Sequence, residues 1–501
     1  MALAPACGDG GGSEPLPPVA SFSETPCALD GIGLDPEQLR CGFVTVPENR
    51  NDPNGRTIEL AVAVARATSD APAPDPVVLL SGGPGDAALD SFLPFLQRVE
   101  AVSALQRNRD VVLFDQRGTG RSRPSLDCPE VDVASLESLT RVQPTREDTR
   151  DSVAALRACH DRLRARGDDL AAYTSAASAR DIRDVMTALG YREWNLYGIS
   201  YGSRLAQTAM RDDPGGIRSV VLDSVVPVQG DIIAEYGRNF ERSLTTLLET
   251  CAADPRCYAA FPDLENSLFD LVRRLDAEPL MVSAEDPDSG ATITVTVTGE
   301  RLLLGLQSAL YDAELIPIVP LVVSLAAAGD TGLLAAAAAD VVSGPRNAEG
   351  MSMSVVCGEE APFLTPDVLE HSALGVRAEI QAVAEDSFVR QTLDACSFWE
   401  AATPAAFENE PVSSAIPTLV FAGQLDPITP PRYGLDVAER LSRARYLEFP
   451  GFGHAILGTA SAEAARPRCA VQIVERFLAD PALPIDDACL SELSPIVFAG
   501  S

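Results

Sequence analysis

The sequence contains no lysine, so all 39 of its basic residues are arginine, and its only histidines are His160, His371 and His454. The absence of lysine excludes Schiff-base cofactor enzymes, lysine-dependent phosphate loops, kinase-type ATP sites and serine–lysine dyads. No Cys-x-x-Cys or His-Glu-x-x-His motif occurs, and three scattered histidines do not supply a usual metal site. We therefore expect neither a metal ion nor an organic cofactor.

Positive charge and long apolar segments are also scarce. The chain has 72 acidic residues, and its net charge of -33 would repel a polyanion. A nucleic-acid partner is therefore not expected. The longest apolar run, residues 315–328, contains two prolines and is too short to span a bilayer. It predicts a buried helix or two helical pieces.

A chain of 501 residues exceeds the size of one hydrophobic core, which stops growing near roughly 250 to 300 residues. From about residue 77, short apolar runs alternate with helical segments, which predicts a mostly parallel sheet flanked by helices. Leu- and Ala-rich segments interrupt this pattern. We expect a flexible N-terminal tether (1–25), the first part of an α/β core (26–230), an inserted helical cap (231–410) and the second part of the core (411–501).

The cysteines point to an oxidising compartment, because eleven are too many for a reduced cytosolic enzyme without metal-ligand spacing. Their spacing favours nearest-neighbour pairs, although sequence alone does not fix disulfide connectivity. These pairs are Cys27–Cys41, Cys128–Cys159, Cys251–Cys257, Cys357–Cys396 and Cys469–Cys489. Cys7 remains unpaired before a Gly/Ser/Pro-rich stretch and resembles the lipidated cysteine of a bacterial lipoprotein. This predicts an exported protein with a possible membrane tether through Cys7.

The pentapeptide Gly198-Ile199-Ser200-Tyr201-Gly202 lies between a predicted strand and a predicted helix. A serine hydroxyl becomes a useful nucleophile when a tight turn exposes it beside a base, and the flanking glycines remove side chains from that turn. Ser200 is therefore the predicted nucleophile. A turn in a nucleotide-binding sheet is the alternative, but the glycine spacing does not fit Gly-x-Gly-x-x-Gly.

The base must be one of the three histidines. His160 lies in a charged helix beside Cys159, and His371 lies in a polar helical segment of the insertion. Only His454 occupies a glycine-rich loop after a strand-like segment. His454 also gives the chain order Ser, acid, His that is typical of α/β hydrolases.

The predicted acid is Asp426, in the loop after the strand-like segment at residues 417–423. It would fix the imidazole tautomer and stabilise the imidazolium. Asp223, at the end of an earlier strand, remains the alternative. For the oxyanion we expect the backbone N–H of Tyr201 and one from the Gly82-Gly83 turn, with Gly83 preferred.

Together these motifs, with Ser81-Gly82-Gly83-Pro84-Gly85 and Asp115-Gln116-Arg117-Gly118-Thr119-Gly120, resemble the proline iminopeptidase and tripeptidyl aminopeptidase branch of the alpha/beta hydrolases. The resemblance covers most of the chain from about residue 40. It implies an α/β-hydrolase fold with a helical cap. The cysteines and the long insertion are more similar to the secreted tripeptidyl aminopeptidases. Ser81 stands where proline iminopeptidases usually carry histidine, which argues against their narrow N-terminal proline specificity.

The resemblance implies a serine aminopeptidase that removes N-terminal residues or tripeptides from peptides with a free N-terminus. Carboxylates bind an α-ammonium group by charge pairing, so Glu359 and Glu360 are candidates, with Glu359 preferred because it takes the family's Cys-x-acid position. A solvated acidic loop is the alternative. The same residues would also suit a carboxylesterase acting on small esters. A lipid-anchored binding protein would require a damaged triad, and every triad residue is present.

Overall fold

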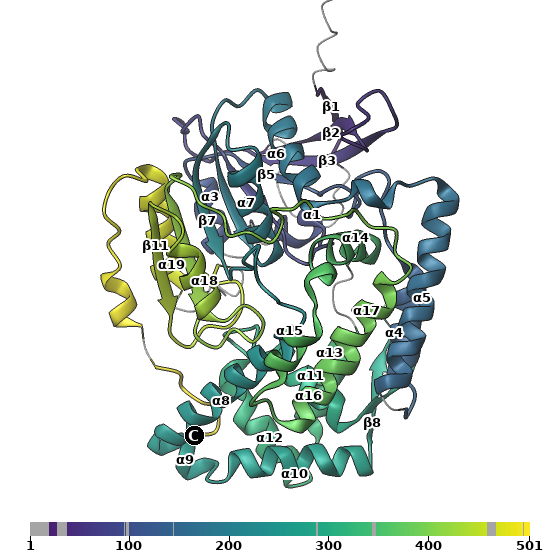
Figure 1. Ribbon diagram of the computed structural model, residues 1–501. Helices are drawn as coiled ribbons and strands as arrows, with labels where there is room; N and C mark the ends of the chain where they lie inside the picture. The colour runs from purple at the N-terminus through teal and green to yellow at the C-terminus, as the bar shows by residue number, and fades with distance from the viewer. Residues whose placement is uncertain are drawn as a thin grey trace, which may run out of the picture.

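The computed structural model describes residues 20–27, 38–94, 96, 100–143, 145–286, 289–342, 347–457, 467–493 and 495–501. Its centre is a nine-stranded sheet with the order β1-β2-β3-β5-β4-β6-β7-β10-β11 (Figure 1). The strands are β1 (Phe22–Thr25), β2 (Leu39–Pro47), β3 (Thr57–Ala65), β4 (Val77–Leu80), β5 (Val111–Phe114), β6 (Trp194–Ile199), β7 (Ile217–Asp223), β10 (Thr418–Gly423) and β11 (Ala444–Phe449).

The six strands from β5 to β11 in this order are parallel, whereas β1, β2 and β3 form an antiparallel edge. The parallel strands β4 and β5 read Val-Val-Leu-Leu and Val-Val-Leu-Phe, and all of their residues are buried. Continuous apolar runs are expected where helices cover both faces of a sheet. The predicted α/β-hydrolase fold with a mostly parallel sheet is confirmed.

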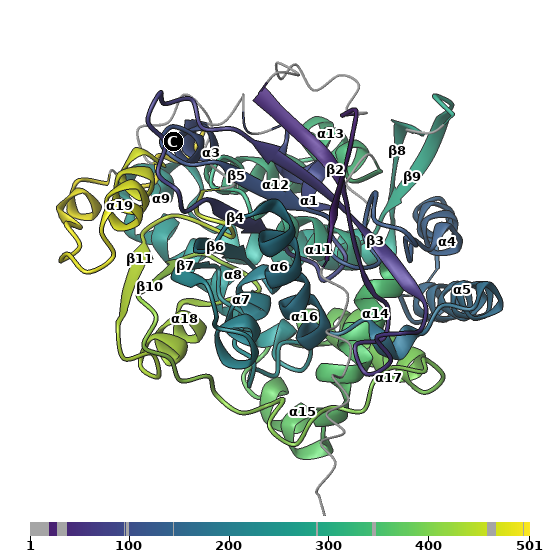
Figure 2. The ribbon, with the colours of Figure 1, turned by 90° about the horizontal axis from the view of Figure 1, so that it is seen from above.

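Helices cover both faces of the sheet (Figure 2). One face carries α6 (Ser175–Leu189), α7 (Tyr201–Asp212) and α18 (Pro431–Ala438), whose apolar residues share one core with alternate strand residues. The other face carries α1 (Ala88–Phe92), α3 (Glu100–Gln106) and α19 (Pro467–Ala479), which share a second core. The parallel strands therefore end at one common edge, where loops can gather side chains.

The chain between β7 and β10 forms a helical layer beside that edge, below the sheet in Figure 1. Its α-helices are α8 (Tyr236–Ala253), α9 (Pro255–Ala260), α10 (Leu264–Ala277), α11 (Gly299–Ala309), α12 (Val319–Ala327), α13 (Gly332–Val342), α14 (Glu349–Glu359), α15 (Pro366–Ala373), α16 (Ala378–Ala384) and α17 (Gln391–Cys396). A two-stranded sheet, β8 (Leu280–Glu285) and β9 (Thr292–Val297), and short 3-10 or π turns complete it.

Most of this layer has its own apolar core, which also includes Leu425 from the loop after β10. The apolar run at residues 315–328 forms a 3-10 turn (Ile316–Ile318) followed by α12, in agreement with the two helical pieces expected. The helices α4 (Pro129–Leu139) and α5 (Thr145–Arg166), which precede β6, also pack against it, on β9 and on α14 and α17 respectively. The cap is therefore built from more of the chain than the insertion alone.

All five predicted disulfides are present, and they join Cys27–Cys41, Cys128–Cys159, Cys251–Cys257, Cys357–Cys396 and Cys469–Cys489. Each of the five bonds stays within one part of the predicted organisation. The fourth, Cys357–Cys396, joins the end of α14 to the end of α17. The nearest-neighbour pairing is thus confirmed, whereas Cys7 lies outside the described residues.

The predicted tether is wrong for its last residues. Phe22–Thr25 forms β1, which pairs antiparallel with β2, and Arg40 lies over the Phe22 ring at 4.5 Å. The backbone hydrogen bonds of this pair and the nearby Cys27–Cys41 bond fix a segment that its composition did not mark as a strand. In the portion of the chain that the structure covers, no helix is both long and apolar enough to cross a membrane.

Candidate active site

Ser200 lies at the sharp turn between β6 and α7, with φ 56° and ψ -124°. A positive φ is uncommon for a residue with a side chain and costs energy that the surrounding structure must offset. The flanking glycines make the turn possible: a Cβ on Gly198 would lie 2.3 Å from the Gly202 carbonyl oxygen, and one on Gly202 would lie 2.0 Å from that of Leu80. The sequence Gly-x-Ser-x-Gly is thus required by close backbone approach.

Hydrogen bonds hold this turn in place. The Ser200 N–H donates to the Asp223 carbonyl at 3.0 Å, and both the N–H and the hydroxyl of Ser203 donate to the Ser200 carbonyl, at 2.8 and 2.6 Å. The Ser203 hydroxyl also accepts the Val226 N–H at 2.9 Å. The side chain of Ser200 therefore projects from a fixed backbone.

His454 and Asp426 form a buried pair at the carboxyl edge of the sheet. Asp426 Oδ2 lies 2.8 Å from His454 Nδ1 and accepts the Thr429 hydroxyl at 2.6 Å, while its Oδ1 accepts the N–H groups of Ile428 and Thr429. Burial alone would raise the pKa of Asp426, but His454 and these hydrogen bonds hold the pKa below its ordinary value. Asp426 is therefore ionised and directs the imidazole, as a catalytic acid requires.

The alternative acid, Asp223, does not contact the His454 ring through any hydrogen bond in the described chain. Its carboxylate accepts the Tyr197 hydroxyl at 2.7 Å and the backbone N–H groups of Ile456 and Leu457 at 2.9 and 3.2 Å. Burial raises the pKa of Asp223 despite these bonds. Asp223 thus holds the loop that follows His454, while Asp426 holds the imidazole.

The other two histidines lie away from Ser200. His160 is buried against Phe398 and Trp399, with ring centroids 5.8 and 5.5 Å away. His371 is exposed on α15, where its Nδ1 lies 2.7 Å from the Asp367 carbonyl oxygen. Neither lines a cavity with Ser200.

Two adjoining cavities of about 500 and 480 Å³ meet at Ser200. Gly83 lines both, Tyr201 lines the first, and a Cβ on Gly82 would lie 3.1 Å from the Ser200 Cβ. Tyr201 begins α7, so its N–H has no acceptor within the helix. The backbone groups expected to hold an oxyanion are thus brought beside Ser200.

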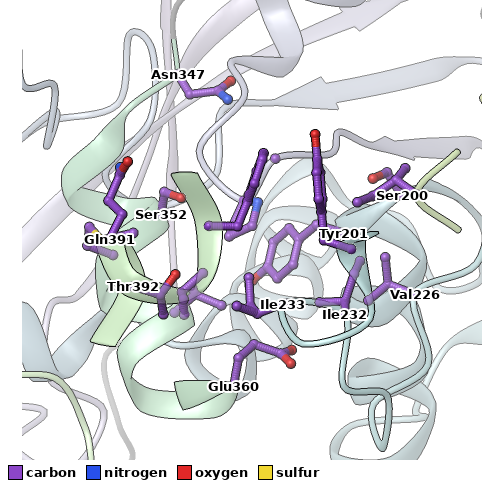
Figure 3. Close-up of a pocket in the computed structure, with 18 of the residues that line it drawn as sticks. Ser200, Tyr201, Val226, Ile232, Ile233, Asn347, Ser352, Glu360, Gln391 and Thr392 are labelled. Carbon is purple, nitrogen blue, oxygen red and sulfur yellow. The ribbon is translucent and has the colours of Figure 1, made fainter. Parts of the chain in front are cut away.

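The larger cavity extends from Ser200 under the helical layer and contains Glu360 (Figure 3). Val226, Ile232 and Ile233 contribute apolar wall surface between Ser200 and Glu360, and Thr392 lines another part of the cavity. The smaller cavity is lined by His454 and by residues of β4 and β6. An apolar cavity with a few polar groups around a nucleophile is the usual form of a substrate site.

The structure does not place Glu359, the preferred candidate, in the wall of the cavity. Glu359 is buried outside the cavity, where its carboxylate accepts the N–H and hydroxyl of Ser175 at 2.6 and 2.5 Å. Glu360 lines the cavity and pairs with Arg204 Nη1 at 2.8 Å. The two residues are adjacent at the end of α14, so their side chains point in different directions.

Three carboxylates surround the one guanidinium of Arg204, since Glu359 and Glu408 lie 3.5 and 3.9 Å from it in addition to Glu360. Burial, opposed by Arg204 and reinforced by the neighbouring carboxylates, raises the pKa of Glu360 to about 7. Arg211 also pairs with Glu408, at 3.3 Å, so two guanidinium groups face three carboxylates at the Glu360 end of the cavity and acid remains in excess. A cation would be favoured there.

Two residues of this site were missed by the sequence analysis. Tyr311, just after α11, places its ring centroid 4.7 Å from that of His454. Its carbonyl oxygen accepts the backbone N–H of His454 at 2.9 Å. Glu349, the first residue of α14, lines the larger cavity. Neither follows a motif, because both reach the site through the packing of the helical layer.

Among the described residues, no group of three or more histidines, cysteines and acidic residues could hold a metal ion. Around Ser200 the structure gathers a serine hydroxyl, the imidazole of His454, the carboxylate of Asp426 and backbone N–H groups. Such a constellation forms and hydrolyses acyl-enzymes.

Comparison with known proteins agrees with this geometry. Residues 75–257 match a family described as alpha/beta hydrolase fold, and residues 381–489 match one described as TAP-like protein. Ser200 lies in the first match, and Asp426 and His454 lie in the second.

Three curated relatives illustrate the range of similar proteins. Over 464 residues the chain is 25% identical to serine protease Hip1 of Mycobacterium tuberculosis, which covers 86% of this chain and 85% of that protein. Over 210 residues it is 31% identical to tripeptidyl aminopeptidase of Streptomyces coelicolor, with 40% and 37% covered. Over 262 residues it is 25% identical to carboxylesterase B of M. tuberculosis, with 50% and 49% covered.

Proposed function

Because the chain belongs to the alpha/beta-hydrolase peptidase family and is a serine hydrolase, we propose that it is an aminopeptidase. The proposed enzyme is exported and removes a short peptide from the N-terminus of its substrates. The observation that carries the proposal is the position of Glu360. Its carboxylate faces the cavity that begins at Ser200, in surroundings with more buried acid than base. A free α-ammonium group is the substrate feature that would complete this charge balance.

The proposed reaction starts with attack of Ser200 Oγ on the scissile carbonyl carbon, while His454 accepts the hydroxyl proton. Asp426 keeps His454 in the productive tautomer and stabilises its protonated form. The N–H groups of Tyr201 and Gly83 stabilise the oxyanion. The C–N bond then breaks, His454 gives its proton to the leaving amine, and water hydrolyses the remaining ester of Ser200.

The two cavities divide the substrate. The leaving amine must lie near His454, which protonates it, and His454 lines the smaller cavity. The acyl part, with the free N-terminus, then occupies the larger cavity beside Glu360. A volume of about 500 Å³ is that of a drug-sized ligand site, so the acyl part is better described as a short peptide than as one amino acid.

Further support comes from the relatives and from the disulfides. One relative is named a serine protease and another a tripeptidyl aminopeptidase, which agrees with peptide hydrolysis near an N-terminus. Five disulfides favour a location outside the reducing cytosol. A peptide substrate in the envelope or outside the cell follows from these two properties.

The test compares Ala-Ala-Pro p-nitroanilide with a free or an acetylated N-terminus. Acetylation removes the positive charge and leaves Glu360 without its partner, so kcat/KM should fall about a hundredfold or more. Glu360→Gln should lower kcat/KM for the free peptide about ten- to a hundredfold and should remove most of the discrimination between the two peptides. Product analysis shows whether one residue or three are released.

The control for folding is the rate at which a small neutral fluorophosphonate labels Ser200 in each variant. Glu439→Gln, an exposed change on the far end of α18, should leave peptide turnover unaltered. Equal turnover of free and acetylated peptides by the wild type would contradict the aminopeptidase. Turnover of a short nitrophenyl ester without any peptide anilide would identify a carboxylesterase instead.

Selection for a free N-terminus should also depend on pH. Because burial and neighbouring carboxylates raise the pKa of Glu360 to about 7, acidification protonates Glu360 and weakens its attraction for an ammonium group. The α-amino group itself loses its proton above about pH 8. Peptide kcat/KM divided by the fluorophosphonate labelling rate should therefore rise up to about pH 7 and fall beyond about pH 8.

Dividing by the labelling rate cancels the titration of the nucleophile and its base, since both reactions use them. In Glu360→Gln the rising limb should disappear, while the falling limb, which belongs to the substrate, should remain. A wild-type ratio that is flat between pH 5 and pH 7 would be inconsistent with ammonium binding by Glu360.

A further inference from the structure

A second carboxylate lines the acyl cavity and has no partner in the described chain. Glu349, at the start of α14, forms no hydrogen bond and no ion pair with any described residue, and its only charged influence is the carboxylate of Asp132. Burial and that neighbour raise the pKa of Glu349 to about 7. Glu349 is half-buried in the cavity wall. A carboxylate that is partly removed from water without a cation or a donor is stabilised by a ligand that supplies one.

Glu349 differs in this respect from the other acids around the cavity. Glu360 is paired with Arg204, and Glu359 is bonded to Ser175. Desolvation of the Glu360 carboxylate is therefore partly offset within the protein, whereas that of Glu349 is not. The cavity thus contains one carboxylate that is paired with an arginine, Glu360, and one that has no cationic neighbour among the described residues, Glu349.

The backbone that carries Glu349 is firmly attached on both sides. The Ala348 N–H donates to the Gly85 carbonyl at 2.9 Å, and the Gly350 N–H donates to the Leu126 carbonyl at 2.9 Å. Close packing reinforces both contacts, since a Cβ on Gly350 would lie 2.5 Å from the Leu126 carbonyl oxygen and one on Gly85 would lie 2.8 Å from the Ala348 carbonyl oxygen. Glu349 is therefore fixed relative to the Gly82–Gly85 turn and to Ser200, which that turn adjoins.

The walls of the same cavity suit a long side chain with a charged end. Tyr236 and Phe388 are stacked with centroids 3.5 Å apart and both line the cavity, as do Ile232 and Ile233. Arginine and lysine bury their methylene chains against apolar surface while the charged group reaches a polar partner. No described arginine of the protein itself takes this place beside Glu349.

We propose that Glu349 binds the cationic side chain of an arginine or lysine in the acyl part of the substrate, so that the enzyme prefers peptides with a basic residue near the N-terminus. This inference rests on the proposed function, because it assigns a side chain to the cavity in which Glu360 would hold the α-ammonium group. Glu360 would then select the free terminus, and Glu349 would select among termini.

The experiment uses free-amine tripeptide p-nitroanilides in which arginine or its neutral isostere citrulline stands at the first, second or third position of an alanine background. The wild type should prefer arginine over citrulline about ten- to a hundredfold in kcat/KM at one position, which is the usual effect of a charged hydrogen bond. In Glu349→Gln this ratio should fall to near one. Glu349→Asp keeps the charge and should retain part of the ratio.

Glu360→Gln is the matched control within the same cavity. It should lower turnover of the arginine and citrulline peptides together and leave their ratio intact, whereas Glu349→Gln should keep the discrimination against acetylated peptides. Fluorophosphonate labelling of Ser200 reports that each variant is folded.

The outcomes separate the two proposals. A wild type that turns over free peptides and rejects acetylated ones, but treats arginine and citrulline alike at all three positions, would overturn the role of Glu349 and leave the aminopeptidase standing. Loss of discrimination against acetylation in Glu349→Gln would also overturn it, because Glu349 would then be the ammonium ligand. Failure of every free peptide anilide would instead overturn the proposed function.

Discussion

Replacing Ser200 with alanine is expected to lower kcat for a peptide anilide by about six orders of magnitude, the loss typical of a missing nucleophile in a serine peptidase. The reason is that the remaining His454, Asp426 and oxyanion donors cannot form the acyl-enzyme. The positive φ of Ser200 costs conformational energy, and such strain is typical of residues at functional sites. Initial rates at saturating substrate, with the fluorophosphonate as a titrant of active enzyme, measure the change.

The control for this variant is Ser135→Ala, an exposed serine on α4 that lines neither cavity. It should leave kcat unchanged. Residual activity in Ser200→Ala above about a thousandth of the wild-type value, after removal of contaminating wild-type enzyme by the titrant, would assign the nucleophile to another residue.

Asp426→Asn should reduce kcat by about four orders of magnitude with a much smaller change in KM. Asparagine has nearly the shape of aspartate, but its amide does not stabilise a protonated imidazole and favours the wrong tautomer of His454. The bonds from Thr429 and Ile428 keep the loop in place, so the loss would be chemical rather than structural. Steady-state kinetics and urea unfolding of the same preparation separate these two causes.

The matched comparison is Asp223→Asn, because Asp223 is as buried as Asp426 and accepts a backbone N–H from the loop that follows His454. Its carboxylate bonds to Tyr197 and to the backbone after His454, so its loss should reduce stability and reduce kcat less than the loss of Asp426. A larger loss of kcat in Asp223→Asn than in Asp426→Asn, with both variants folded, would transfer the role of the acid to Asp223.

The turn that carries Ser200, the candidate nucleophile, was the most predictable part of the candidate site. Only glycine fits on either side of Ser200, because a Cβ at Gly198 or Gly202 would lie 2.3 or 2.0 Å from a backbone oxygen. The residue types therefore reveal the backbone geometry. His454 and Asp426 follow strands of the sheet, and the carboxyl ends of parallel strands meet at one edge. The disulfides were equally accessible, because their sequence separations are short, between 6 and 39 residues.

The cavity walls were less predictable, because they come from the helical layer. Glu359 and Glu360 are neighbours in sequence, and only the packing of α14 on Ser175 and Arg204 decides which of them faces the cavity. Tyr311 reaches His454 through a carbonyl, which every residue type possesses. Glu349 is one of 72 acids, and its distinction, the lack of a partner among the residues that the structure describes, is visible only when the neighbours are known.

The Cys357–Cys396 bond joins two helices that both line the larger cavity, since α14 bears Glu349 and Met353 and α17 bears Gln391 and Thr392. Ser200, Asp426 and His454 belong to the sheet and its loops, which this bond does not touch. The bond therefore holds one wall of the larger cavity, whereas the sheet and its loops carry Ser200, Asp426 and His454. We therefore expect reduction of this bond to loosen the cavity wall, and with it the choice of substrate, before it lowers the reactivity of Ser200.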